Sequence, residues 1–203
     1  MNKNILGILN LLKLAERLKS ELRHSWLSSG RQESVAEHTW QMALMAILVH
    51  NHLDKPVNLE HTLKMIIVHD LVEAEAGDIP FFETGKRKTQ KSQKEQKAIE
   101  NIKRMIDAKT GKDIYFLFQE FEEGKTPEAK LAKALDHLEV QAQHNLADFS
   151  TWEKIEYDLV YTKMDEPCAH DSFLQQLCYA LKIQAEEKMQ ANGIDVTSIK
   201  RRL

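Results

Sequence analysis

Residues that interrupt regular structure are scarce in this chain. Only 7 glycines and 4 prolines occur among 203 residues, so most segments between them are long enough for helices of several turns. Alternating segments typical of strands are rare, and no internal repeat or Pro/Gly-rich linker divides the chain. These absences predict an all-α protein in which residues 1–203 form a single compact helical bundle.

Cysteines are few, and the chain has neither an excess of positive charge nor a long apolar run. Two cysteines, Cys168 and Cys178, cannot build a dense disulfide framework, which favours a reducing compartment. The formal charge of −3 argues against nucleic acid or a membrane surface as the main partner. No stretch reaches the roughly 18 apolar residues of a membrane span, and charged residues interrupt the N-terminal segment, as they would not in a signal peptide. We therefore expect a cytoplasmic protein.

Capping signals and apolar periodicity indicate where the helices lie. Ser34 and Glu37 match a capping box, and Ser150 with Glu153 repeats that spacing. The final ten residues are expected to fray. With the apolar periodicity, the capping signals predict helices over residues 5–18, 34–52, 58–77, 86–109, 115–121, 127–146 and 171–191.

The segment 58–77 carries the strongest chemical signal. It is apolar nearly all the way round, which predicts a central buried helix, yet it contains the pair His69-Asp70. A buried carboxylate is costly unless it is paired or bound to a metal ion, so Asp70 needs a partner. A histidine, an arginine or a metal ion would serve. Successive helical side chains diverge by about 100°, which disfavours a bond within the pair but lets both reach one ion beside the helix.

A metal ion at this pair needs further ligands from other helices. His38, near the start of its helix, and Asp136, a carboxylate in an otherwise core-facing segment, are the candidates. A second pair, His170-Asp171, lies in an expected loop, where Asp171 is best explained as a helix cap. Two histidines and two aspartates suit one divalent ion such as Mn²⁺, Co²⁺, Fe²⁺, Ni²⁺ or Zn²⁺, with Mg²⁺ a further candidate.

The order of these residues resembles the H…HD…D signature of the HD-domain metal-dependent phosphohydrolases. Three longer segments extend the likeness: ESVAEH at 33–38, HDLVE with GDIP at 69–80, and TPEAK with LDHLE at 126–139. The resemblance spans about residues 8–185 and points to the compact branch that includes the bacterial 5′-deoxynucleotidases. It implies one all-α HD domain, with a core at about 30–150 and flanking helices packed on it. It also implies a homodimer that removes the 5′-phosphate from nucleoside monophosphates.

The resemblance also implies roles at the site. The four metal ligands would be His38, His69, Asp70 and Asp136, which leave two positions of an octahedral ion open for water and a phosphate oxygen. Glu73, four residues after His69, is the first candidate to orient or deprotonate the attacking water. Asp78, beyond the helix-ending Gly77, would position the water, protonate the leaving oxygen or hold the sugar.

Substrate contacts are indicated by several further residues. Arg23 stands where the family has its phosphate-orienting arginine, whose planar guanidinium grips two oxygens at once; Arg31 is a weaker candidate. In the best-described deoxynucleotidases a tryptophan directly follows this arginine and disfavours a ribose 2′-hydroxyl. This chain has His24 at that position, so its selectivity for deoxyribose stays open. Trp26 is a candidate for the sugar pocket or, equally, for the core. The remaining candidates for substrate binding are Ile79, Pro80, Phe81 and Glu122.

Two alternatives to a 5′-nucleotidase remain. One is an HD phosphohydrolase acting on a nucleoside triphosphate or on a cyclic or polyphosphorylated nucleotide, although the chain is short for the former. The other is a non-catalytic helical module with a structural metal, which would not require Glu73, Asp78 or Arg23. We predict no site role for His137 or His144. The Lys-rich stretch 86–97 is expected to be a solvated helix with too few aromatics to bind nucleic acid.

Overall fold

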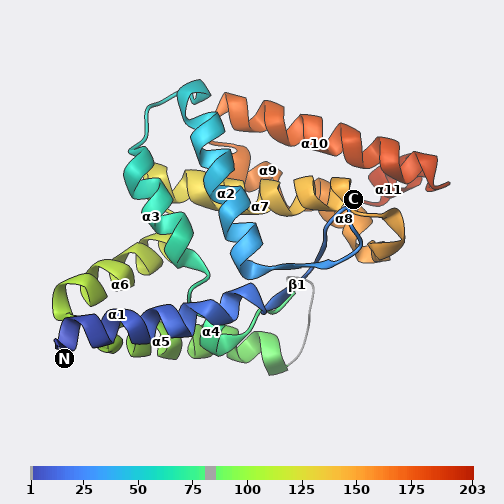
Figure 1. The fold of residues 1–203 in the computed structure, drawn as a ribbon. Helices are drawn as coiled ribbons and strands as arrows, with labels where there is room; N and C mark the ends of the chain where they lie inside the picture. The colour runs from blue at the N-terminus through green and yellow to red at the C-terminus, as the bar shows by residue number, and fades with distance from the viewer. Residues whose placement is uncertain (1, 81–85) are drawn as a thin grey trace.

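The computed structural model describes residues 2–80 and 86–203, those of 86–89 by their backbone alone (Figure 1). The prediction of an all-α protein is confirmed, because the described residues are predominantly helical and add only one small sheet. Among these residues, none of the helices has the length and apolar character needed to cross a membrane. The helices are α1 (Lys3–Ala15), α2 (Val35–Val49), α3 (Leu59–His69), α4 (Glu73–Ala76), α5 (Lys86–Met105), α6 (Ala108–Glu123), α7 (Pro127–Leu146), α8 (Lys154–Thr162), α9 (Asp165–Cys168), α10 (Ser172–Ala191) and α11 (Val196–Arg202).

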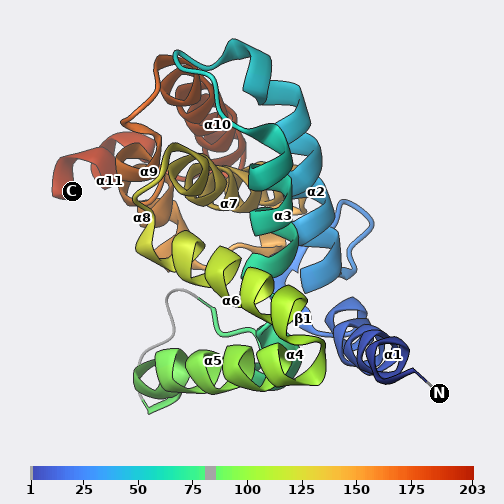
Figure 2. The same cartoon turned by 90° about the vertical axis from the view of Figure 1, so that its left-hand side faces the viewer.

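Helix α7 lies at the centre of the bundle. It contacts α2, α3, α6, α9, α10 and the strand β1 (Leu22–Trp26). In both views α10 lies above α7, while α1, α4 and α5 form a layer below it (Figures 1 and 2). The main core surrounds α7 and includes Met42, Met65, Leu131, Leu135 and Leu174. A second apolar cluster, with Leu14, Val68, Ile99, Ile102 and Phe118, joins the lower layer to α3 and α6.

The predicted capping box at the start of α2 is confirmed. Ser34 Oγ accepts a hydrogen bond from the Glu37 backbone N–H at 3.4 Å, and Glu37 Oε2 accepts one from the Ser34 N–H at 2.9 Å. This reciprocal cap starts the helix one turn before His38. The cap at Asp171 is confirmed too, since its carboxylate accepts from the N–H groups of Phe173 and Leu174.

The prediction of one continuous, fully buried helix over residues 58–77 is wrong. Helix α3 ends at His69, and Asp70 leaves helical geometry with φ −98° and ψ 6°. The N–H groups of Leu71, Glu73 and Ala74 donate to the third preceding carbonyl, and this tighter turn leads the chain into the short α4. Nor is α3 buried all round: Ile67 is 61% exposed, because the helix packs on α2, α6 and α7 with its other faces.

Three smaller expectations also need correction. A two-stranded antiparallel sheet pairs β1 with β2 (Gln32–Ser34), and strands this short leave almost no pattern in the sequence. Ser150 lies in a 3₁₀ turn, and the capping box is formed instead by Glu153 and Glu156 at the start of α8. The final residues form α11, which buries Val196 and Ile199 and is held by these apolar contacts.

Truncation of a central core side chain should destabilise the protein strongly. Leu135 of α7 is fully buried, so Leu135→Ala is expected to lower the free energy of unfolding by about 2–5 kcal/mol through lost burial and a cavity. Lys130→Ala, on an exposed position of the same helix, should change it by less than about 0.5 kcal/mol. Urea denaturation measures both. We propose that the chain is one domain, so circular dichroism and fluorescence should report the same transition; equal stabilities for both variants would contradict the central place of α7.

Candidate metal centre and substrate cavity

Two buried histidines each use one ring nitrogen to bind the protein. His69 Nδ1 lies 2.6 Å from the Ile66 carbonyl oxygen, and His38 Nδ1 makes a short hydrogen bond to the buried Glu139 carboxylate. Because Nδ1 donates in each case, the neutral ring carries its lone pair on Nε2. Both Nε2 atoms are buried and make no hydrogen bond within the part of the chain that the structure describes.

The four predicted metal ligands converge at these lone pairs. His38 Nε2 lies 3.2 Å from Asp136 Oδ1, and His69 Nε2 lies 3.1 Å from Asp70 Oδ2. Ligand atoms of His38, His69 and Asp136 all lie within 4.8 Å of one another, while Asp70 Oδ2 is 3.8 Å from His38 Nε2. Orphaned imidazole nitrogens beside carboxylates fit a divalent cation, which binds such atoms at about 2.0–2.2 Å.

Charge at this cluster is held on the carboxylates. Burial pushes the pKa of Asp70 upward, but His69 and Arg23 outweigh it and hold that pKa at about 2. The pKa of Asp136 is likewise lowered, against burial, by His38 and His69. Ionised carboxylates are the form that binds metal. Burial and Arg23 lower the pKa of His38, but Glu139 and Asp136 outweigh them and raise it to about 10, so an ion that binds here would displace a proton from this ring.

Arg23 of β1 lies beside this cluster. Its Nη1 donates to Asp70 Oδ2 at 3.3 Å, and its Nε lies 3.7 Å from the buried Glu33 Oε2. The Arg23 side chain is only 14% exposed and lines the adjoining cavity, so it presents fixed positive charge next to the candidate metal position. Glu33, which the sequence placed in the ESVAEH segment without a role, thus lies beside this arginine.

Two further acids adjoin the candidate metal ligands. Glu73 is 3% exposed, and burial together with Asp70 and Asp78 raises its pKa to about 10. Burial also raises the pKa of Asp78. Gly77 turns the chain here with φ +78°, a conformation that glycine adopts readily, so that Asp78 returns to the cavity. Both groups are therefore suited to hold or exchange a proton at this place.

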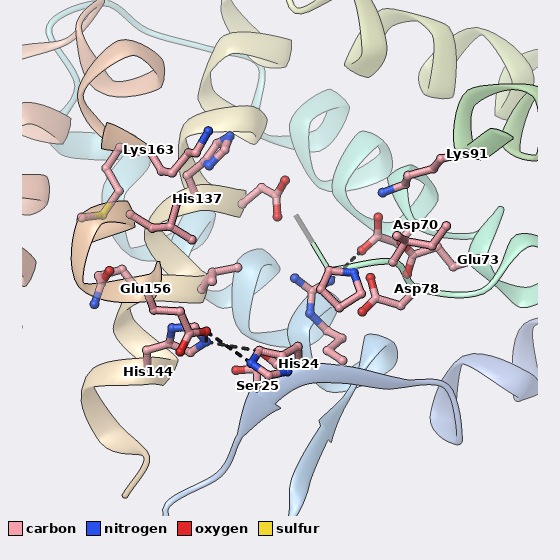
Figure 3. A pocket seen from close by; sticks show the side chains of 18 residues that line it. His24, Ser25, Asp70, Glu73, Asp78, Lys91, His137, His144, Glu156 and Lys163 are labelled. Carbon is pink, nitrogen blue, oxygen red and sulfur yellow. Dashed lines mark hydrogen bonds and ion pairs between the residues drawn. The ribbon is translucent and has the colours of Figure 1, made fainter. Parts of the chain in front are cut away.

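A cavity of about 220 Å³ adjoins the cluster (Figure 3). In this view Asp70, Glu73, Asp78 and Lys91 lie on one side, and His24, His144 and Glu156 on the other. We call the first group, with Arg23 and Asp136, the metal end. We define the distal end as His24 of β1 together with the lining residues of α7 beyond His137 and those of α8 and the turn after it: His24, Val140, Gln141, His144, Glu156, Leu159, Lys163 and Met164.

The predicted substrate residues divide into three groups. Ile79 and Pro80 line the cavity as expected. Trp26 lies outside the lining and packs edge-on against His24, with ring centroids 4.8 Å apart. Glu122 is exposed on α6 and does not reach the cavity, and Phe81 lies outside the described residues.

Several residues that line the cavity were not predicted from the sequence to be part of a site. Lys91 was expected to be solvated, but it lines the metal end, where Glu95 and Glu73 raise its pKa against the effect of burial. The Lys91–Glu95 pair, four residues apart and 3.5 Å between Nζ and Oε1, is a common surface pattern and gave no signal. His137 and His144 line the cavity too, since α7 presents them on its cavity side.

Fold and side chains together define a class: helical proteins with a buried His/Asp cluster suited to a divalent cation, beside a cavity that holds arginine and lysine. The HD domain family matches residues 15–176, and the chain belongs to this family. The family implies a divalent metal ion, in agreement with the ligand atoms gathered at His38, His69 and Asp136.

Relatives of known name lie within the same family. The chain is 36% identical over 139 residues to the 5′-deoxynucleotidase HDDC2 of Danio rerio, covering 68% of each protein. It is 34% identical to the 5′-deoxynucleotidase hdd1 of Schizosaccharomyces pombe, covering 68% of this chain and 71% of that one. A crystal structure of a predicted metal-dependent phosphohydrolase from Magnetospirillum magnetotacticum superposes with a TM-score of 0.79 at 23% identity, over 95% and 96% of the two chains. That last likeness concerns the fold alone.

Proposed function

We propose that the protein is a metal-dependent 5′-nucleotidase that removes the 5′-phosphate from ribo- or deoxyribonucleoside monophosphates. One observation carries the proposal: a single cavity joins the His38/His69/Asp70/Asp136 cluster and Arg23 to a distal end with apolar walls. Such a cavity suits a molecule with a phosphate at one end and a flat, partly apolar group at the other. The relatives named 5′-deoxynucleotidases support the same reaction class.

The residues at the metal end have two kinds of role in phosphate ester hydrolysis: some bind the ion and others contact the substrate. His38, His69, Asp70 and Asp136 would hold the ion. Once bound, a divalent ion supplies Lewis acidity, which lowers the pKa of water and offsets charge at phosphorus.

Three other side chains of the chain act on the substrate. Arg23 orients the phosphate by donating to two of its oxygens. Glu73 orients the attacking water and takes its proton. Burial, Asp70 and Asp78 keep Glu73 protonated in the metal-free chain by raising its pKa to about 10, so this role requires the positive charge that a bound cation would add beside it. Asp78 holds or protonates the leaving 5′-oxygen from the other side of the turn at Gly77.

The mixed nitrogen and oxygen ligand set favours Mn²⁺, Co²⁺, Fe²⁺, Ni²⁺ or Zn²⁺, with Mg²⁺ as a further candidate. Protein stripped of metal and reloaded with each ion in turn is assayed for phosphate release from ribo- and deoxyribonucleoside monophosphates, triphosphates and cyclic dinucleotides. We expect release from monophosphates of both sugars. Release from none of these compounds by protein that holds a metal would overturn the proposal, and release from triphosphates alone would favour a different HD phosphohydrolase.

We further propose that the protein is a homodimer. Helix α2 supports this, because its outer face exposes four large apolar side chains at helical spacing: Trp40, Leu44, Ile47 and Leu48. An apolar stripe of this kind on a soluble protein commonly marks an interface.

Charges placed in this stripe should therefore separate the subunits. The double variant Trp40→Glu/Leu48→Glu is expected to halve the mass measured by light scattering, whereas Tyr179→Glu, on the exposed face of α10, should leave it unchanged. A monomeric wild type, or a double variant with unaltered mass, would refute this interface.

A further inference from the structure

The distal end of the cavity holds a buried polar cluster that phosphate hydrolysis does not use. Glu156 of α8 is only 4% exposed, and its Oε1 lies 3.5 Å from His24 Nε2 and 3.7 Å from His144 Nε2 (Figure 3). These side chains come from α8, β1 and α7 respectively, three elements distant in the sequence. All three line the cavity.

Only one of the two carboxylate oxygens of Glu156 has a structural role. Oε2 accepts a hydrogen bond from the Glu153 backbone N–H at 2.7 Å and so caps α8. Oε1 is left to the two imidazoles. Burial lowers the pKa of His144 to about 4, so this ring is neutral and does not neutralise the acid.

The acid can nevertheless be ionised under ordinary assay conditions. Burial raises the pKa of Glu156 to about 7, which means that above this pH the group is a carboxylate and acts only as an acceptor. A ligand group that donates a hydrogen bond to Oε1 would satisfy it.

The walls around this cluster suit a flat ring. Val140, Leu159 and Met164 supply apolar surface, and Gln141 adds one further polar group. A nucleoside 5′-monophosphate carries its phosphate and its base at opposite ends, with the sugar between them. With the phosphate beside Arg23 at the metal end, the base is the part that reaches the distal end.

We infer that the distal end is a nucleobase subsite in which Glu156 Oε1 accepts a hydrogen bond from an exocyclic amino group of the base. The inference rests on the proposed 5′-nucleotidase function and adds its substrate preference: amino-bearing bases over those with a carbonyl at the same ring position. His24 and His144 lie beside this carboxylate oxygen, with their Nε2 atoms 3.5 Å and 3.7 Å from it.

Two matched nucleotide pairs test this preference at pH 8.5. CMP and UMP differ at one ring position in an amino or carbonyl group, as do AMP and IMP. Glu156→Gln is the sharpest variant, because glutamine also serves at this position of a capping box while it replaces the acceptor by a donor. Glu153→Gln, a half-exposed neighbour outside the cavity lining, is the control. Ribose 5-phosphate, which lacks a base, reports on phosphate handling alone.

We expect the wild type and Glu153→Gln to favour CMP over UMP and AMP over IMP in kcat/KM. In Glu156→Gln both preferences should fall by about 10-fold to 100-fold, the effect of one hydrogen bond to a charged group, and chiefly through KM. The kcat/KM for ribose 5-phosphate should change less than about twofold. Unaltered base preferences in Glu156→Gln, or equal KM values for ribose 5-phosphate and the nucleotides, would overturn the inference.

A second variant tests the inference if Glu156→Gln does not fold. Leu159→Trp fills the distal end from its apolar wall and should raise KM for all four nucleotides while sparing ribose 5-phosphate. A KM unchanged for the nucleotides would also overturn the inference. Failure of the proposed function has a different signature, since the wild type would then release phosphate from neither the nucleotides nor ribose 5-phosphate.

Discussion

Replacement of Asp136 by alanine is expected to abolish both metal binding and phosphate release. Asp136 Oδ1 lies 3.2 Å from His38 Nε2, and the chain keeps its carboxylate ionised, so its loss removes a charged ligand from a four-residue set. Without the ion, we expect kcat/KM to fall by at least about 10³-fold, since charge at phosphorus is no longer offset. Metal content by mass spectrometry and phosphate release measure the two effects together.

The fold itself should survive this substitution. The Asp136 side chain is 31% exposed and the neighbouring Leu135 and Leu138 carry the core packing of α7, so circular dichroism should be unchanged. His170→Ala, in the second His-Asp pair, is a matched control: it is exposed and should retain metal and activity. Stoichiometric metal in folded Asp136→Ala would mean that the proposed fourth ligand is wrong.

The second large effect is expected at Glu73. Glu73→Gln keeps the size of the side chain but cannot accept a proton, so kcat should fall by about 10²–10⁴-fold, the range of general acid–base catalysis. Because Glu73 is not among the proposed ligands, the metal content should be that of the wild type. Steady-state kinetics of the metal-loaded protein measure the loss.

Glu75 offers the matched control for this variant. It lies on the same short helix, but is exposed and accepts a hydrogen bond from Asn101 Nδ2 at 3.0 Å, away from the cavity. Glu75→Gln should therefore retain wild-type kcat. A Glu73→Gln variant with full activity would assign proton transfer elsewhere, with Asp78 as the next group to test.

Local signals in the sequence identified several helix starts, and together with the family resemblance they indicated the candidate ligands. The capping box at Ser34 and Glu37 depends on residues three apart, so it is readable without a structure. His38, His69, Asp70 and Asp136 were predicted to meet, and the structure brings them together; their role as metal ligands stays a prediction.

Tertiary contacts explain what the sequence could not show. The segment 71–76 consists of helix-compatible residues, so the break at Asp70 depends on its surroundings, including the hydrogen bond from Arg23 across 47 residues. The Glu139 bond to His38 spans 101 residues. Lys91 follows an ordinary surface pattern and becomes a cavity residue only because α5 packs on α4. The spacing of residues along one helix does not show which side chains a neighbouring helix will cover.

A titration of metal-stripped protein with a divalent ion tests the central claim most directly. Bound ion per chain and phosphate release from a nucleoside monophosphate are measured on the same samples. If the His38/His69/Asp70/Asp136 cluster holds the catalytic ion, activity should rise in proportion to bound metal and reach its plateau at one ion per chain. Full activity of the stripped protein, or a plateau reached only after a second ion binds, would contradict the account.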